Sequence, residues 1–171
     1  MKNFWLAAAA LTGMIGMAHA DGAPAASDHT AAEAQVQQLV NAFQTAIIAG
    51  DGNKLNTMFL PDHGAWISVF DDDTYRLVKA KHPDAPKLMP DDYKKFTDFV
   101  SAKAKPMEEK FSNVRIQTNG TVATVYFDYV FLLDGKQTNS GNETWQLVKT
   151  IDGWKINSML YSITLDPASM H

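Results

Sequence analysis

The apolar residues near the start of the folded region recur at helical spacing. Thr30 and Glu33 have the spacing of a capping box, and Gly50 suits a left-handed helix end. Between them, five apolar residues follow the i, i+3, i+4, i+7 recurrence of one helical face: Val36, Leu39, Val40, Phe43 and Ile47. The pattern therefore predicts an amphipathic helix that starts at Thr30 and ends before Gly50.

Shorter patterns follow this helix. Residues 51–61 predict a second short helix, and residues 65–70 read as a strand. Residues 74–88 mix charges with prolines, so we expect a loop or an irregular crossover there. Pro90 is suited to a first helical turn, and we expect a third helix from it that ends before Pro106.

The hydrophobic period changes to two in the second half of the chain. Asn119-Gly120 is a preferred hairpin turn, and residues 121–133 form a long β-branched and aromatic run. A polar connection over residues 134–142 leads to a last hairpin that turns at Asp152-Gly153. Helices followed by a four-stranded antiparallel meander predict an α+β fold.

The register of the last hairpin follows by counting outward from Asp152-Gly153. This count pairs Ile151 with Trp154 and Trp145 with Leu160, and it places Glu143 on the same face. We expect that tryptophan-bearing face to be the core face. In the long strand, residues 125–133 give an apolar side at alternate positions, but the opposite side, which carries Asp128, is also rather apolar. We therefore expect a homodimer through the outer face of the sheet.

The first twenty residues have the pattern of an export signal. One lysine precedes an apolar run, and Ala18-His19-Ala20 is a small-x-small cleavage triplet. A membrane anchor is the alternative, but the run is shorter than the roughly 20 residues of a bilayer span and contains Gly13 and Gly16. We predict a signal peptide at 1–20, a flexible lead at 21–29, one domain at 30–165, and a periplasmic or secreted protein that no longer contacts the membrane.

Composition narrows the classes of function. Loss of residues 1–20 changes the formal net charge from −4 to −5, which gives nucleic acid no basic surface to bind. The chain has no cysteine, so packing rather than disulfides must stabilise it. The five histidines show no metal-ligand spacing, and no phosphate-binding loop or nucleophile elbow occurs. We expect neither a metal nor a cofactor.

Three motifs in order resemble the nuclear-transport-factor-2-like, or SnoaL-like, superfamily. They are Ala49-Gly50-Asp51, LPDHGAW at 60–66 and WQLVKTIDGWKI at 145–156. The resemblance covers about residues 31–163. It implies a cystatin-like cone, in which a curved antiparallel sheet wraps around N-terminal helices and leaves a ligand pocket at its wide end.

The catalytic residues of the isomerases in this superfamily do not carry over. The position of their oxyanion-binding tyrosine falls on Phe43, and that of their proton-moving aspartate falls on Ile67 or Ser68. Their late-strand acid falls near Gln146, a few residues from Glu143. A shared fold does not restore the activity when these groups are missing.

Three carboxylates remain as candidate acids or bases. Glu143 is placed on the apolar face by the register, although a frayed strand end would leave it in solvent. Asp128 lies inside an apolar strand, where it either serves a site or faces outward to a partner or water. Asp62 stands beside His63 at a helix-to-strand junction, where such a pair more often turns the chain.

The side chains that we expect to line the pocket are mostly aromatic, and each is otherwise an ordinary core residue: Phe43, Trp66, Tyr129, Glu143 and Trp145. The main hypothesis is an exported domain that binds a small apolar or heteroaromatic molecule. The alternatives are an isomerase, dehydratase or cyclase type of enzyme that uses a pocket carboxylate, and a protein-interaction module.

Overall fold

The computed structural model describes residues 29–61 and 64–166 of the chain. It contains four helices in this part: α1 (Thr30–Ala49), α2 (Gly52–Asn56), α3 (Asp72–Lys81) and α4 (Tyr93–Ser101). Helix α1 ends as predicted, because Gly50 adopts a left-handed conformation with φ of 62° and its N–H bonds back to the last turn. The predicted signal peptide and nearly all of the flexible lead lie outside the described residues.

Six strands form one sheet. They are β1 (Trp66–Phe70), β2 (Leu88–Asp91), β3 (Met107–Thr118), β4 (Val122–Leu133), β5 (Lys136–Thr150) and β6 (Gly153–Leu165). Their order across the sheet is β2-β1-β6-β5-β4-β3. The last four strands form the predicted antiparallel meander. Strand β1 adds to β6 in parallel, and β2 adds to β1 in antiparallel orientation.

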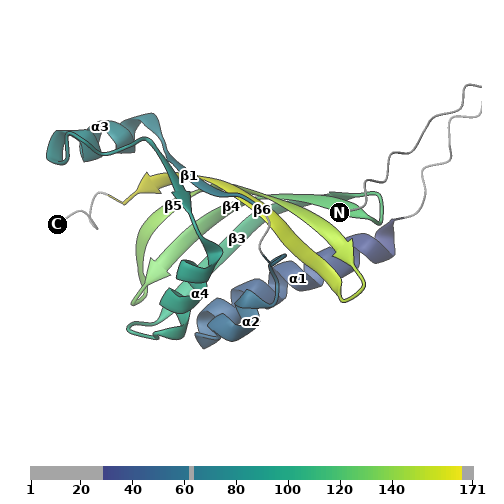
Figure 1. The fold of residues 1–171 in the computed structure, drawn as a ribbon. Helices are drawn as coiled ribbons and strands as arrows, with labels where there is room; N and C mark the ends of the chain where they lie inside the picture. Colours follow the sequence, from purple (N-terminus) through teal and green to yellow (C-terminus); the bar gives the residue numbers. More distant parts are fainter. Residues whose placement is uncertain (1–28, 62–63, 167–171) are drawn as a thin grey trace, which may run out of the picture.

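The sheet curves over the helices and encloses a single core. Helices α1, α2 and α4 lie on the concave side of the sheet, whereas α3 projects beyond its edge (Figure 1). The apolar face of α1 is buried against the inward residues of the strands, and its Val36, Val40 and Phe43 are almost fully covered. This arrangement confirms the predicted α+β fold with a curved sheet around N-terminal helices.

The prediction of a loop over residues 74–88 is wrong. Helix α3 occupies 72–81, and the Asp71 side chain caps it by accepting a hydrogen bond from the Thr74 N–H at 2.7 Å. The sequence pattern missed this helix because most of it is exposed and it has no apolar stripe to display. Pro90 also lies in the edge strand β2 rather than in a helix, and α4 begins at Tyr93 after its cap, Asp92.

The last hairpin turns one residue earlier than predicted. Thr150 pairs with Gly153, so Ile151 and Asp152 form the turn and Ile151 is fully exposed. A register shift follows, because Leu147 pairs with Ile156 but Gln146 pairs with Ser158. The extra residue in β6 is a β-bulge.

The bulge decides which side chains of β6 face the core. Trp145 pairs with Met159 rather than with Leu160, and both Trp145 and Met159 are buried. Leu160 points outward with 54% of its surface exposed, so the prediction that it shares the core face with Trp145 is wrong. The inward placement of Trp145 itself is confirmed.

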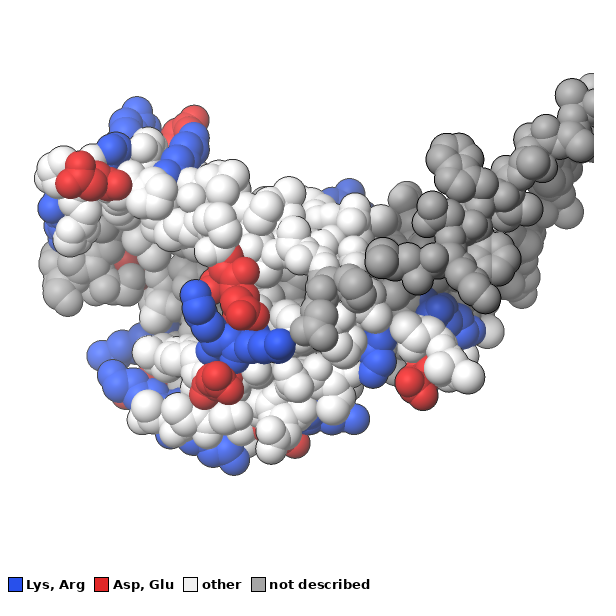
Figure 2. Space-filling view, in the orientation of Figure 1, with Lys and Arg blue, Asp and Glu red and all other residues white. Residues whose placement is uncertain are grey.

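The surface carries charges of both signs. Acidic and basic side chains are interspersed on the face seen in Figure 2, and neither sign gathers into one broad patch there. This mixture of charges agrees with the small negative net charge of the chain.

Candidate functional site

A cavity of about 210 Å³ lies between the concave side of the sheet and helices α1 and α4. Aromatic rings form much of its wall: Phe43, Trp66, Phe96, Phe99, Tyr129, Phe131 and Tyr161. The polar side chains in the wall are those of Asp91, Glu109, Asn139 and Glu143. Apolar walls with a few polar groups are typical of small-molecule sites.

Two of these polar groups are buried carboxyls. Glu109 on β3 retains 8% of its surface and Glu143 on β5 retains 4%. Strand β4 lies between them, where Glu109 pairs with Phe131 and Glu143 pairs with Phe127. The pleat turns both acids inward, because their positions alternate with exposed neighbours along each strand. No described lysine, arginine or histidine lines the cavity with them.

Burial makes both carboxyls hard to ionise. Desolvation raises the pKa of Glu143 to about 8. Desolvation also raises the pKa of Glu109 well above its usual range, and the nearby charge of Glu143 raises it further. At neutral pH Glu143 is therefore mainly protonated, and a protonated carboxyl can donate as well as accept a hydrogen bond.

One hydrogen bond orients Glu143. The Trp145 indole Nε1 donates to Glu143 Oε1 at 2.5 Å, and this bond partly opposes the rise in the pKa of Glu143. Trp145 itself has no exposed surface and packs against Phe43 at 4.9 Å between ring centroids. It therefore supports the cavity wall from behind and does not line the cavity.

Two tyrosines flank the acids. The Tyr129 hydroxyl donates to the backbone oxygen of Ser162 at 2.9 Å, and burial with the nearby acids raises its pKa. Tyr161 pairs with Glu143 across β5 and β6, and burial raises its pKa as well. Gly141 lies opposite Tyr129, where a Cβ atom would stand only 2.1 Å from the same Ser162 oxygen. A side chain at Gly141 would therefore disturb the anchor of Tyr129.

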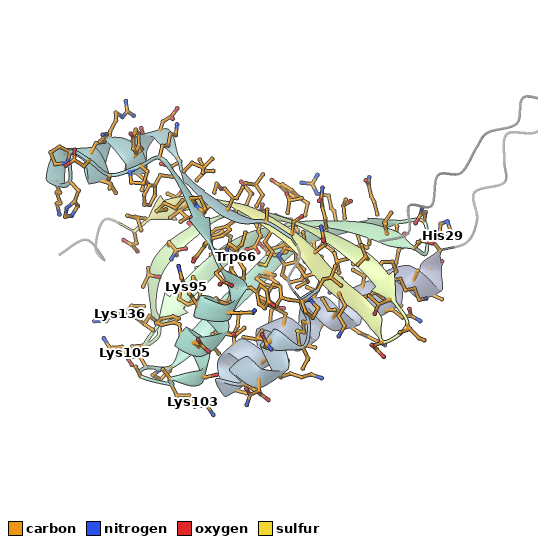
Figure 3. All side chains as sticks on the ribbon, in the orientation of Figure 1. His29, Trp66, Lys95, Lys103, Lys105 and Lys136 are labelled. Carbon is orange, nitrogen blue, oxygen red and sulfur yellow. The ribbon has the colours of Figure 1, made fainter. Side chains whose placement is uncertain are left out.

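The indole of Trp66 brings a buried donor to the cavity. The side chain of Trp66 extends from β1 toward α4 (Figure 3), and its ring centroid lies 5.4 Å from that of Phe96. Only 9% of its surface is exposed, and its Nε1 has no hydrogen-bond acceptor among the described residues. The Tyr161 hydroxyl lies close enough to this nitrogen to lower the pKa of Tyr161 slightly, but the two groups are not aligned as a hydrogen bond. An unsatisfied buried donor is costly, and an acceptor atom on a bound molecule would relieve it.

A second hollow, of about 320 Å³, lies next to the inner cavity. It shares Trp66, Asp91 and Met159 with the inner cavity, and it is otherwise lined by more polar groups such as Asp92 and Lys94. We place the candidate site in the inner cavity, because the buried acids lie only there.

The structure brings together four of the predicted pocket residues. Phe43, Trp66, Tyr129 and Glu143 all line the inner cavity, whereas Trp145 lies behind its wall. These positions are what a ligand site would require.

The other two candidate acids do not contribute to the cavity. Asp128 faces the outer side of the sheet, where its carboxylate accepts hydrogen bonds from Asn142 and, at 2.6 Å, from Asn113. This is the outward alternative, and it separates Asp128 from the chemistry of the cavity. Asp62 lies outside the described residues.

Sequence reasoning missed Glu109 and Asp91. The predicted strand began only beyond Lys110, although Met107, Glu109 and Phe111 already alternate with exposed residues at a period of two. That alternation was the available signal for Glu109. Asp91 was assigned to a helix start, whereas it ends the edge strand at the cavity mouth.

The fold and the site agree with a match to one protein family. The model of the SnoaL-like domain matches residues 36–166, so the chain belongs to the SnoaL-like family. No curated protein matches the sequence. The family assignment defines a fold that hosts both ligand-binding and enzyme domains.

Solved structures show the same fold at low sequence identity. A nuclear-transport-factor-2-like protein of unknown function from Shewanella baltica has 15% identity and a TM-score of 0.57, with 81% of this chain and 98% of that chain covered. A protein of the same family from Streptomyces avermitilis, described as a candidate dehydratase, has 21% identity and a TM-score of 0.57, with 80% and 99% covered. A cystatin-like protein of unknown function from Nostoc punctiforme has 15% identity and a TM-score of 0.54, with 80% and 92% covered.

Two other features are missing from the described part of the chain. Among residues 29–61 and 64–166, no three His, Cys, Asp or Glu side chains are grouped so that they could hold a metal ion. No helix in these ranges combines the length and the apolar character needed to cross a membrane.

Proposed function

We propose that this chain is a small-molecule-binding domain whose inner cavity takes one mainly apolar ligand of about one ring. The observation that carries the proposal is the cavity of about 210 Å³ with aromatic walls. An engineered cavity of about 150 Å³ is large enough for benzene. A six-membered ring with a short substituent therefore matches the space, whereas a fused three- or four-ring molecule does not.

A ligand screen by thermal unfolding tests this proposal. A saturating ligand stabilises the folded state by RT ln(1 + [L]/Kd), or about 2.7 kcal/mol at a concentration of 100 Kd. We expect one-ring compounds to raise the unfolding temperature and steroid-sized compounds to leave it unchanged. If no apolar or heteroaromatic compound raises it, the proposal fails.

An acid–base enzyme is the second candidate function. It is supported by the location of Glu143 in the cavity and by its pKa of about 8, which suits a group that gives and takes a proton near neutrality. Deuterium exchange into the α-position of a cyclic enone such as 2-cyclohexenone, followed by NMR, tests this function. Exchange that is no faster than in buffer, or that is unchanged in Glu143→Gln, removes this candidate.

We also propose export and a homodimer. The signal pattern at residues 1–20 supports export, and N-terminal sequencing of the protein recovered from a bacterial periplasm should begin at Asp21.

Apolar outer residues such as Val122 and Leu160, which are 49% and 54% exposed, support a sheet-to-sheet dimer. An interaction module for a different protein is the remaining alternative, and co-purification of a stable heteromeric partner would favour it over the dimer.

A further inference from the structure

The inner cavity has polar groups at two separate places. Glu109 and Glu143 lie on β3 and β5, and the Trp66 Nε1–H comes from β1. Strand β6 separates β1 from β5, so Trp66 and Glu143 have backbones roughly 10 Å apart at the usual strand spacing. Aromatic rings fill the wall between these groups.

We propose that the ligand is a small organic cation, namely a one-ring primary amine with a hydrogen-bond acceptor at its opposite end. This inference rests on the proposed binding function and specifies the ligand of that cavity. The ammonium group would donate to Glu109 and Glu143, the ring would lie among Phe43, Phe96 and Phe131, and the acceptor would receive the Trp66 N–H.

Three features of the wall support a cation. Two buried carboxyls share the cavity with no described basic side chain in its lining, so the only positive charge available to them there is one that a ligand supplies. Several aromatic rings line the same cavity, and a ring face within about 6 Å of an ammonium group adds cation–π attraction. The exposed Asp91 at the mouth adds a third acid.

The unsatisfied N–H of Trp66 is a separate reason to expect a hydrogen-bond acceptor at the far end of the ligand. A bare alkylammonium ion has only donors, and it would leave the indole N–H without an acceptor. A hydroxyl or carbonyl oxygen at the far end of the ring satisfies it. A para-substituted phenylethylamine spans a distance of the required order.

The affinity of the two acids for a cation should change with pH in a characteristic direction. The titratable groups that line the cavity with the two glutamates are Tyr129, Tyr161 and Asp91, and the lysines of α4, Lys94 and Lys95, are exposed and do not line it. An ammonium ion binds best when a carboxyl has lost its proton. Its affinity should therefore rise with pH up to the pKa of Glu143, by as much as about tenfold per unit. A neutral ligand that accepts hydrogen bonds from the protonated acids should show the opposite trend.

Tyramine and tyrosol form the matched pair of probes, because they differ only by an ammonium group in place of a hydroxyl. Isothermal titration of the full chain at pH 6, 7 and 8 in two buffers of different ionisation enthalpy measures affinity and proton release. We expect tyramine to bind at least tenfold more tightly than tyrosol at pH 8. We also expect its binding to release about one proton and to strengthen from pH 6 to pH 8.

Variants assign the effect to the named groups. Glu109→Gln and Glu143→Gln should bring tyramine to the affinity of tyrosol, whereas Glu108→Gln, on the partly exposed neighbouring position of β3, should leave it unchanged. Trp66→Phe should reduce tyramine to the affinity of 2-phenylethylamine, which lacks the acceptor.

Several results would overturn the inference. They are equal or tighter binding of tyrosol, an affinity for tyramine that falls as pH rises, and no binding of tyramine at all. Binding of tyrosol or other neutral one-ring compounds in those cases leaves the proposed pocket standing. If neutral compounds also fail to bind, the proposed function fails with the inference.

Discussion

The Trp145 indole N–H donates a 2.5 Å hydrogen bond to the carboxyl of Glu143, two residues earlier on the same strand. Both side chains point inward because the strand period is two, and both are almost completely buried. The bond fixes one oxygen of Glu143 and leaves the other available to the cavity. A residue of the core therefore controls the orientation of a residue of the site.

Trp145→Phe keeps a six-membered aromatic ring and removes this donor. The bond favours the ionised carboxyl, so its loss should raise the pKa of Glu143 above about 8. The free energy of unfolding should fall by about 1 kcal/mol for the lost hydrogen bond, with a further loss for the smaller ring. Carbon-13 NMR titration of the glutamate carboxyls measures the pKa.

Trp154→Phe is the matched control. The Trp154 Nε1 donates to Gln35 at 3.2 Å, and no bond joins it to the acids of the cavity. This variant should leave the pKa of Glu143 unchanged. An equal change in both variants would mean that general loosening of the core, rather than the lost hydrogen bond, shifts the pKa.

Stability should decrease as pH rises from about 5 to 8. The folded-state pKa of Glu143 lies above its unfolded value of 4.5, so between these values the folded state holds a proton that the unfolded state has lost. The resulting stabilisation is fully present below pH 4.5 and is lost as pH rises through about 8. The raised pKa of Glu109 adds to it with the same sign.

Urea denaturation at one-unit pH steps measures this effect, which should amount to several kcal/mol in all at about 1.4 kcal/mol per unit of pKa shift. Glu143→Gln removes one of the two titrating groups and should make the profile less steep. A wild-type profile that stays level or rises from pH 5 to 8 would contradict the burial of protonated acids.

Two phenylalanines of the cavity should separate stability from binding. Phe43 is 1% exposed and contacts several rings of the core, so Phe43→Ala should lower the free energy of unfolding by about 3–5 kcal/mol. Phe99 also lines the cavity but is 47% exposed, so Phe99→Ala should cost less than about 1 kcal/mol. If the cavity binds a ligand, Phe99→Ala should weaken binding while the fold stays intact, as calorimetry can show.

Gly141→Ala should disturb the sheet next to the site. The new Cβ atom would lie 2.1 Å from the Ser162 backbone oxygen, so β5 and β6 must separate locally, at a cost of about 1–3 kcal/mol. The Tyr129 hydroxyl should lose its acceptor, which a shift of the tyrosine ring signals in NMR spectra would report. Gly135→Asn is the control, because its turn has open space and asparagine tolerates a φ of 71°.

Leu160→Arg tests the proposed homodimer. Leu160 lies on the outer face of the sheet, where two facing arginines would bring like charges into the interface. Light scattering at micromolar concentration should give a dimer for the wild type and a monomer for this variant. Leu77→Arg, which changes a similarly exposed leucine on α3, should remain dimeric. A monomeric wild type would rule out the dimer at that concentration.

Local signals in the sequence determined the helical start and the meander. The apolar stripe and Gly50 act within a few turns of one helix, so they locate α1 within residues 30–50, whereas the predicted capping box is wrong because His29, and not Thr30, is the N-cap residue and makes no side-chain cap hydrogen bond. Alternation likewise placed the inward side of β4, because Val125, Phe127 and Tyr129 bury the same face that the pattern assigned to them. The inward direction of Glu143 follows from the same period, since it lies two positions before Trp145 on the same strand.

The tertiary structure decided the rest, because it depends on contacts between distant segments. The bulge in β6 changes which side of the sheet Leu160 occupies, and β1 pairs in parallel with a strand about ninety residues later. Glu109 and Glu143 share one cavity because their strands lie on either side of β4 and the sheet curves over α1. Desolvation by the surrounding layers then raises the pKa of both acids, and no local pattern can report how completely a carboxyl is removed from water.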